Sequence, residues 1–244
     1  MTFKASISAA TLKHIFLSLK DLCQDVNLMV SSDGVSITAM DTAHVSLSRL
    51  RLPMTAFTSF HVDRDECLGV NVATLCTLLN CCNKDTDVVL ETGDDGLHLT
   101  SVSPTMTTAF CMHLLHIDAD DVDIPDVEYS NTIQLPSATY KHIVTDALRF
   151  GQSTTITMAT DSVRLVTSGD MGTFATTLTP NDTTTIASST DFTCTLATRY
   201  LHVFSKACTL SSSVSLMGSE GLPMCVHFAF EGGGEMAFYL APQV

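Results

Sequence analysis

A short motif occurs four times along this chain of 244 residues. The motif is an Ala-Thr pair followed by apolar residues at helical spacing, and the pairs begin at Ala10, Ala73, Ala138 and Ala197. A turn signal flanked by alternating apolar residues follows at a similar distance after each pair: Asp33-Gly34, Asp95-Gly96, Asp161-Ser162 and Glu220-Gly221. A helix followed by a hairpin, repeated four times, is an internal repeat, and such a repeat decides the fold before other features are considered.

The repeat predicts two similar domains with two helix-plus-hairpin units each, because the length allows two domains of about 120 residues. Residues 116–129 hold six acids and one Pro but no Gly, which indicates an exposed crossover segment. We therefore expect an N-terminal domain at 1–116, a connector at 117–127 and a C-terminal domain at 128–244.

Each helical stretch is amphipathic. Leu12, Ile15, Phe16 and Leu19 lie on one face of the first stretch, which must pack against other elements. The later stretches repeat this stripe with Leu75, Leu78, Leu79 and Cys82, with Tyr140, Ile143, Val144 and Ala147, and with Tyr200, Val203, Phe204 and Ala207. The Thr of each pair is expected to cap its helix through the side-chain hydroxyl: Thr11, Thr74, Thr139 and Thr198.

The rest of the sequence is typical of antiparallel strands, so the predicted fold class is α+β, with helices on one face of curved antiparallel sheets. Two Thr-rich strands, at 105–115 and 174–179, have no obvious partner within their own pair of repeats. Because an unpaired strand edge offers free backbone groups, these segments invite pairing with another copy of the chain.

The charge of the chain is strongly uneven. The formal net charge is −14, which by itself argues against a nucleic-acid partner. However, the four helical stretches (10–20, 72–84, 138–149 and 197–206) carry seven Lys or Arg and one acid, Asp146. The remaining residues carry five Lys or Arg and 25 acids. Cations concentrated on four equivalent helices indicate a surface for phosphate, although a solvated polar face is the simpler interpretation of any single helix.

The nine cysteines show no C-x-x-C spacing, and five of them stand in apolar runs: Cys23, Cys76, Cys111, Cys194 and Cys225. We expect these five to be small buried residues of a protein in a reducing, intracellular compartment. No apolar run reaches the 18 residues of a membrane span.

No catalytic signature is present: G-x-S-x-G, the P-loop and G-x-G-x-x-G are all absent. The acidic segment offers oxygen ligands, but a calcium loop that begins at Asp118 would need Gly and Glu where Asp123 and Tyr129 stand. The sequence therefore predicts no catalytic residue, no metal and no cofactor.

Several short segments carry a family resemblance: M-D-T-A-H-V (40–45), D-R (63–64), G-V-N (69–71), I-P (124–125), E-Y-S (128–130), R-Y-L-H-V-F-S-K-A (199–207), L-S-S (210–212) and Y-L-A-P (239–242). By these segments, over its whole length, the chain resembles the proliferating cell nuclear antigens, the DNA sliding clamps of eukaryotes and archaea. The resemblance implies a head-to-tail homotrimer of two-domain subunits, with the helices around a central hole and the sheets outside.

In such a ring the cationic helix faces would contact the phosphates of duplex DNA without reading its sequence. The predicted DNA contacts are Lys13, Lys20, Lys84, Lys141, Arg149, Arg199, His202 and Lys206. The strands at 107–113 and 172–178 would pair between subunits through Thr108, Phe110, Met112, Thr173, Phe174 and Thr176.

The resemblance also implies a docking pocket for partner peptides, suited to aromatic and aliphatic anchors with basic flanks. Its predicted residues are Met40, His44, Val45, Leu47, Val122, Ile124, Pro223, Tyr239, Ala241 and Pro242. The residues alone leave open whether Met40 and Val45 are ordinary core. The implied partners are DNA polymerase, other proteins with clamp-binding motifs and a clamp loader, with no membrane. The implied location is nuclear, or a viral or parasite replication site.

The sequence departs from the family at three lysine positions, where Thr77, Asn80 and Thr160 stand. The second helix is therefore expected to be weakly cationic, and modification of the ubiquitin type is not expected at Thr160. Two alternatives to a homotrimeric clamp remain: a subunit of a heterotrimeric checkpoint-type clamp, and a metal-dependent hydrolase that uses Asp120 and Asp121.

Overall fold

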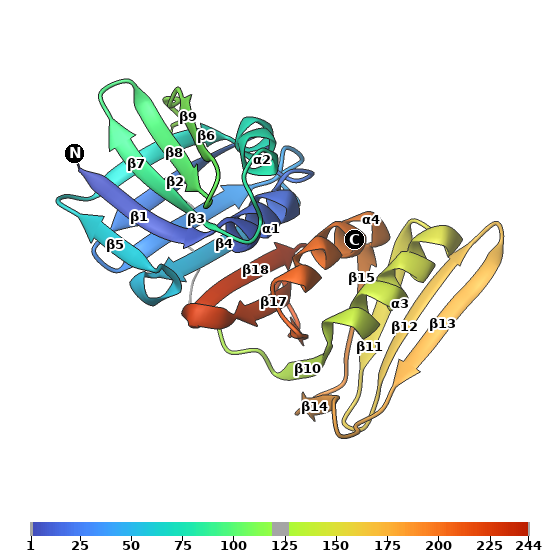
Figure 1. Cartoon of the computed structure of the whole chain (residues 1–244). Coiled ribbons are helices and arrows are strands. Elements are labelled where there is room, and N and C mark those ends of the chain that lie inside the picture. The colour runs from blue at the N-terminus through green and yellow to red at the C-terminus, as the bar shows by residue number, and fades with distance from the viewer. Residues whose placement is uncertain (1, 119–126, 244) are drawn as a thin grey trace. The chain divides into compact units, whose positions relative to one another are not determined.

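The computed structural model describes residues 2–118 and 127–243 (Figure 1). It divides into two compact units. Among the described residues, unit 1 holds 2–42, 48–118 and 230–236, and unit 2 holds 43–47, 127–229 and 237–243. None of the described helices is both long and apolar enough to cross a membrane.

Unit 1 begins with a strand, a helix and a hairpin, and continues mainly as strands. Its elements are β1 (Phe3–Ser8), α1 (Ala9–Leu19), β2 (Asp25–Ser31), β3 (Gly34–Met40), most of β4 (Ser46–Pro53), η1 (Met54–Ala56), β5 (Ser59–Val62), β6 (Glu66–Asn71), α2 (Val72–Asn80), β7 (Asp87–Gly93), β8 (Gly96–Val102), β9 (Thr107–Met112) and η3 (Glu231–Gly233).

Unit 2 repeats the same succession. Its elements are β10 (Asn131–Pro136), α3 (Ser137–Phe150), β11 (Ser153–Met158), β12 (Val163–Gly169), β13 (Gly172–Leu178), β14 (Thr185–Ser188), β15 (Phe192–Ala197), α4 (Thr198–Phe204), η2 (Ser205–Thr209), β16 (Ser213–Gly218) and most of β17 (Met224–Phe230) and of β18 (Gly234–Leu240).

The two units have the same topology. In unit 1 the strand orders are β5-β1-β7-β8-β9 and β4-β3-β2-β6, and in unit 2 they are β14-β10-β16-β17-β18 and β13-β12-β11-β15. Each strand of one order has a counterpart at the same place in the other, so the fourfold repeat is real and the α+β prediction is confirmed. Each repeat also contains a strand before its helix (β1, β6, β10 or β15), which the sequence pattern did not show.

All four predicted turns join hairpins: β2–β3, β7–β8, β11–β12 and β16–β17. Glycine is required at two of these turns. Gly34 has φ +140°, and a Cβ there would lie 2.0 Å from the carbonyl oxygen of Leu52. Gly96 has φ +146° and a comparable approach of 2.3 Å to the carbonyl oxygen of Met112. A larger residue at either place would strain the backbone and force neighbouring strands apart.

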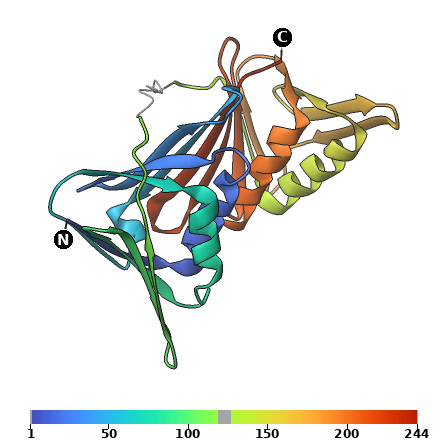
Figure 2. The same ribbon diagram turned by 90° about the horizontal axis from the view of Figure 1, so that it is seen from above.

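Within each unit the helices pack in a pair, α1 with α2 and α3 with α4 (Figure 2). The predicted stripes of α1 and α3 are buried as expected. The predictions for the stripes of α2 and α4 are partly wrong, because α2 buries Cys76 instead of Leu78 and α4 buries Leu201 instead of Val203. Cys82 lies beyond the end of α2 and is half-buried. Burial of each large apolar side chain contributes about 1.5–3 kcal/mol.

Aromatic side chains connect the helices of unit 2 to its strands. The rings of Phe204 on α4 and Phe238 on β18 stack with centroids 4.6 Å apart. The buried hydroxyl of Tyr140 on α3 donates to the carbonyl oxygen of Leu201 on α4 at 2.9 Å. These contacts fix the two helices of the unit against each other and against the sheet beneath them.

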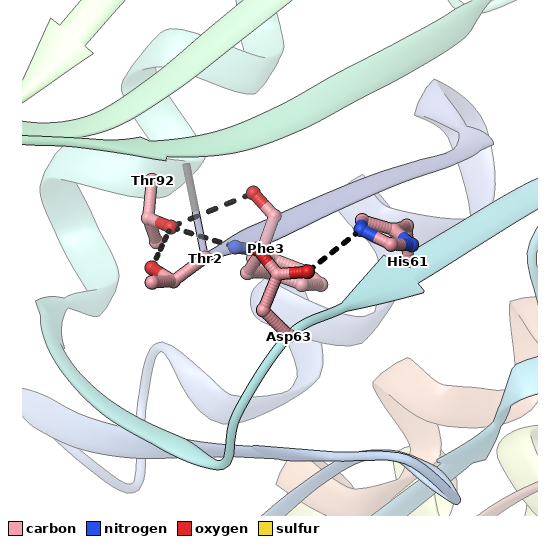
Figure 3. Close-up of polar contacts among 5 residues, drawn as sticks. All are labelled: Thr2, Phe3, His61, Asp63 and Thr92. Carbon is pink, nitrogen blue, oxygen red and sulfur yellow. Dashed lines mark hydrogen bonds and ion pairs between the residues drawn. The ribbon is translucent and has the colours of Figure 1, made fainter.

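In unit 1 a buried threonine joins two strands at their ends (Figure 3). The backbone N–H of Phe3 donates to the Oγ1 of Thr92 at 3.0 Å, and the hydroxyls of Thr2 and Thr92 are 3.0 Å apart. The contact fastens the start of β1 to β7. The other pair in Figure 3, His61 and Asp63, is exposed, with Nε2 and Oδ1 3.0 Å apart, so it adds little stability.

The nine cysteines are all free. Cys23, Cys76, Cys194 and Cys225 are buried as predicted, and burial raises the pKa of the Cys225 thiol to about 12. The prediction for Cys111 is wrong, because this residue is exposed. It lies on β9, at the edge of its sheet, where one face of the strand is open to solvent.

The capping prediction is also wrong, because the caps lie three residues before the expected Thr. The Oγ of Ser8 accepts from the backbone N–H of Thr11 at 3.4 Å. The Oδ1 of Asn71 accepts from the backbone N–H of Thr74 at 2.9 Å. The helices α3 and α4 begin without a side-chain cap.

Replacement of Asn71 by Ala should therefore lower the free energy of unfolding by about 1 kcal/mol, since a capping side chain contributes about 0.5–2 kcal/mol. Urea denaturation followed by circular dichroism measures the change. Thr139→Ala is the matched control, because this Thr belongs to a helix without a side-chain cap, and it should change stability by less than about 0.5 kcal/mol. If Thr139→Ala lowered the free energy of unfolding more than Asn71→Ala did, the Thr of the repeat would be the capping residue after all.

Candidate functional site

The predicted cations do not all lie on helices. Lys13, Lys141, Arg149 and Arg199 lie on helices, Lys206 lies in η2 and Lys20 follows the end of α1. The prediction for Lys84 is wrong in one respect: α2 ends at Asn80, so Lys84 stands in the turn after it. The helix α2 therefore carries no Lys or Arg, and its exposed Thr77 and Asn80 are uncharged.

Most of these cations are accessible to a ligand. Lys20, Lys84, Lys141, Arg149 and Arg199 are exposed, whereas Lys13, His202 and Lys206 are half-buried. The Nδ1 atom of His202 is buried and has no hydrogen-bond partner among the described residues. Beside Lys13, the pKa of His14 is lowered by burial and then by the lysine charge, so His14 is neutral at neutral pH.

Two arginines of unit 2 are held by neighbouring side chains. The Nη1 atom of Arg149 is 3.2 Å from Asp146, the acid that the sequence analysis singled out on the helices. The guanidinium group of Arg199 lies over the ring of Tyr200, with Cζ 4.6 Å from the ring centroid. Stacking orients this cation and leaves its charge available, whereas the ion pair partly neutralises Arg149.

Both predicted interface strands lie at the ends of their sheets. The strand β9 pairs with β8, and β13 pairs with β12. The expectation that these strands lack partners within their own half is thus wrong for one of the two edges of each strand. On its other side, neither strand pairs with any strand among the described residues.

These two edges are also unprotected. The sequences T-T-A-F-C-M of β9 and G-T-F-A-T-T-L of β13 contain no charged residue and no Pro, the usual means of blocking an edge. The edge strands β5 and β14 have only four residues each. Along β6, Gly69 is bridged to Leu115, and along β15 the carbonyl oxygen of Thr195 accepts from the N–H of Gln243.

The predicted interface side chains support the edges from within each unit. Phe174 of β13 stacks on Phe150 of α3, with centroids 5.6 Å apart. Met112 is buried, whereas Thr108, Phe110 and Thr176 are half-buried and Thr173 is exposed. Each edge thus presents apolar groups together with free backbone donors and acceptors.

Part of the predicted peptide pocket is assembled in unit 2. A hollow of about 1010 Å³ is lined by His44, Val45, Ala241 and Pro242. The N–H of Ala241 donates to the carbonyl oxygen of Val45 at 3.1 Å, which joins two distant segments of the chain. His44 has φ +54°, a backbone conformation that a residue other than Gly rarely adopts.

The other predicted pocket residues do not line this hollow. Leu47 is buried, Tyr239 is half-buried and the exposed Pro223 accepts a hydrogen bond from the hydroxyl of Tyr129. Met40 belongs to unit 1, and Val122 and Ile124 lie outside the described residues.

The hollow brings in residues that the sequence analysis assigned elsewhere or missed. Arg149 and Arg199, predicted as DNA contacts, line it together with Met171, which is 76% exposed. The exposed Leu148 lies beside them. The two arginines are recognisable in the sequence as cations, but no motif indicates that they share a hollow with His44 and Val45.

Comparison with known proteins decides the family. Residues 2–123 match the model described as "Proliferating cell nuclear antigen, N-terminal domain", and residues 123–243 match the corresponding C-terminal domain. The chain belongs to the proliferating cell nuclear antigen family. It is 32% identical to the proliferating cell nuclear antigen of Chaetomium thermophilum over 247 residues, which cover 97% of this chain and 95% of that relative.

Members of this family are DNA sliding clamps of replication, and they are not enzymes. The family thus agrees with a cationic DNA-binding surface and with a chain that lacks catalytic motifs. The residues of the metal-hydrolase alternative, Asp120 and Asp121, lie outside the described residues.

The open edges predict that the purified chain self-associates through β9 and β13. Phe110→Ala should weaken self-association by roughly 30-fold, because loss of an interface aromatic costs about 2 kcal/mol or more. Sedimentation velocity over a concentration series measures this. Phe60→Ala is the control, since Phe60 is a half-buried aromatic on the opposite edge of the same sheet. Equal weakening by both variants, or a chain that stays monomeric throughout, would contradict the assignment.

Proposed function

We propose that the chain forms a homotrimeric ring that encircles duplex DNA and holds DNA polymerase and other proteins on it. The observation that carries this proposal is the pair of open edges, one in each of two units of the same topology. Because β9 and β13 differ, pairing between copies is head-to-tail and can continue from copy to copy until it closes. Membership of a clamp family supports closure as a ring.

The cations of the helices would face the DNA in this ring. Lysine and arginine side chains bind phosphate oxygens whatever the base sequence, and such binding weakens with salt. The contacts would be few, since α2 carries no Lys or Arg and Arg149 is paired with Asp146. Weak contacts suit a protein that stays on DNA because it surrounds it and that must move along it.

The hollow of unit 2 would hold part of a partner peptide. Val45 is 37% exposed beside Ala241 and Pro242, which offers an apolar surface for an aliphatic or aromatic anchor. The acids that favour basic peptide flanks lie mostly in the segment outside the described residues, whereas Arg149 and Arg199 would favour a carboxylate on the part of the peptide in the hollow. Clamp loader and polymerase are the partners proposed, at a nuclear or viral replication site.

Topological retention is the decisive property of a ring. After loading by a clamp loader, the protein should stay on closed circular DNA in high salt and leave linear DNA by its ends. Gel filtration of the DNA-bound fraction before and after linearisation measures this. Equal loss from both DNA forms would reject encirclement, and a chain that is stable only as a monomer would favour the heterotrimeric checkpoint-type clamp.

The proposal that the cations face DNA in the central hole of the ring is tested on the same loaded complex. Lys20→Glu with Lys206→Glu should reduce polymerase stimulation several-fold and flatten its salt dependence while the oligomer stays intact, since phosphate contacts are lost. Arg64→Glu with Arg164→Glu is the matched control, because it changes the net charge equally at exposed positions outside the helices. Equal effects of the two double variants would show that total charge matters and that the positions of Lys20 and Lys206 do not.

The docking surface is tested by Val45→Asp, which places a charge at the edge of the hollow. It should weaken binding of a polymerase-derived peptide by about tenfold or more, because a hydrated carboxylate would replace the apolar surface that receives the anchor. Fluorescence anisotropy measures the affinity. Met29→Asp is the control, since Met29 is 47% exposed on β2 of unit 1. Unchanged binding by Val45→Asp would place the peptide elsewhere.

A further inference from the structure

Three side chains of different chemistry meet at the hairpin end of the sheet that contains β9. His98 on β8 and Cys111 on β9 are direct partners across the two strands, so their side chains lie on the same face. Asp95 stands in the turn between β7 and β8, close to both side chains. From the sequence, Asp95 was expected only in a turn and Cys111 only as a buried residue, and none of the three was expected to bind a ligand.

The ligand atoms are already close together. The Nε2 of His98 lies 2.7 Å from an Asp95 carboxylate oxygen, and the Sγ of Cys111 lies 3.6 Å from the other. The Cys111 sulfur is 4.0 Å from the same histidine nitrogen. Around a tetrahedral zinc ion with bonds of about 2.0–2.3 Å, neighbouring ligand atoms are roughly 3.3–3.7 Å apart. The cluster therefore needs only a small opening of the Asp95–His98 pair.

A glycine keeps the space beside the cluster open. A Cβ at Gly93 would lie 2.7 Å from the Nε2 of His98 and 3.1 Å from the Oδ1 of Asp95. Any other residue there would push these two ligand groups away. On the outer side, the side chains of Asp95 and His98 are 66% and 39% exposed, so solvent reaches the cluster.

We propose that Asp95, His98 and Cys111 bind one Zn²⁺ ion, with water in the fourth position. Thiolate, imidazole and carboxylate together suit zinc, whereas calcium and magnesium prefer oxygen ligands alone. On binding, the Cys111 thiol releases its proton to solvent and a Zn–S bond forms. His98 binds through Nε2, so the Nε2 proton that it now donates to Asp95 passes to solvent, and the neutral ring carries its single proton on Nδ1. Asp95 exchanges its hydrogen bonds for the metal.

The ion would join the turn, β8 and β9 on one face of the sheet. Pairing with another chain uses the backbone edge of β9, so the two interactions are compatible. The metal would hold the end of β9 against β8 and lower the mobility of this edge strand. The proposal does not depend on the ring.

Calorimetric titration of the metal-free full chain with ZnCl₂ is expected to show one ion per chain. Co²⁺ in its place is expected to show a thiolate-to-cobalt charge-transfer absorption. Cys111→Ser and His98→Gln should each weaken binding by at least about 100-fold, because loss of an outer partner alone costs about 10–100-fold. All three ligands are surface groups, so circular dichroism should show these variants folded.

Control variants at other cysteines test whether the zinc is bound at Cys111. Cys67→Ser removes an exposed thiol of β6, and Cys81→Ser with Cys82→Ser removes the adjacent pair after α2. These variants should retain full zinc affinity and the cobalt spectrum, and zinc should slow hydrogen exchange of the β9 amides in the unmodified chain. Absence of stoichiometric binding, or binding that survives Cys111→Ser, would overturn the proposal.

Discussion

Hydrogen bonding along strand edges is the interaction on which this molecule depends. Nearly every backbone group of the strands must find a partner, and antiparallel pairing supplies it inside each unit. Among the described strands it also ends at β9 and β13, where the outer edge keeps donors and acceptors with no charged or Pro residue to block them. The proposed assembly, the support that Phe174 gives to its edge and the place of the proposed zinc site all depend on where the pairing stops.

Much of the fold could be predicted because it rests on local periodicity. The stripes of α1 and α3 and all four hairpin turns follow directly from spacing and from Asp-Gly or similar turns. The misses have local reasons. The cap of α2 is Asn71, which ends the preceding strand, and that strand was not recognised as part of the repeat. Lys84 was assigned to a helix because nothing in the sequence marks the end at Asn80.

The candidate sites were less predictable, because they depend on contacts between distant segments. Cys111 was expected to be buried since it stands in an apolar run, but an edge strand exposes alternate residues. Its pairing with His98 depends on the register of β8 and β9. Likewise, the hollow that joins Val45 to Arg149 forms only when segments far apart in the sequence meet in unit 2.

The distribution of charge must allow a strongly acidic chain to bind DNA, which is a polyanion. The described helices carry few acids, and Asp146 is already engaged by Arg149 and His142. A chain with net charge −14 repels DNA at long range, and only the local cations of the helices oppose this. Free diffusion onto DNA would thus be slow, which suits the loading partner proposed above.

The shared topology of the two units has an evolutionary consequence. A half-length ancestor with this strand order would have carried the counterparts of both β9 and β13 on a single small protein. The two units now differ in their charged groups: α2 of unit 1 carries no Lys or Arg, whereas Arg149 and Arg199 line the hollow of unit 2. The same strand order thus carries different chemistry in the two halves of the chain.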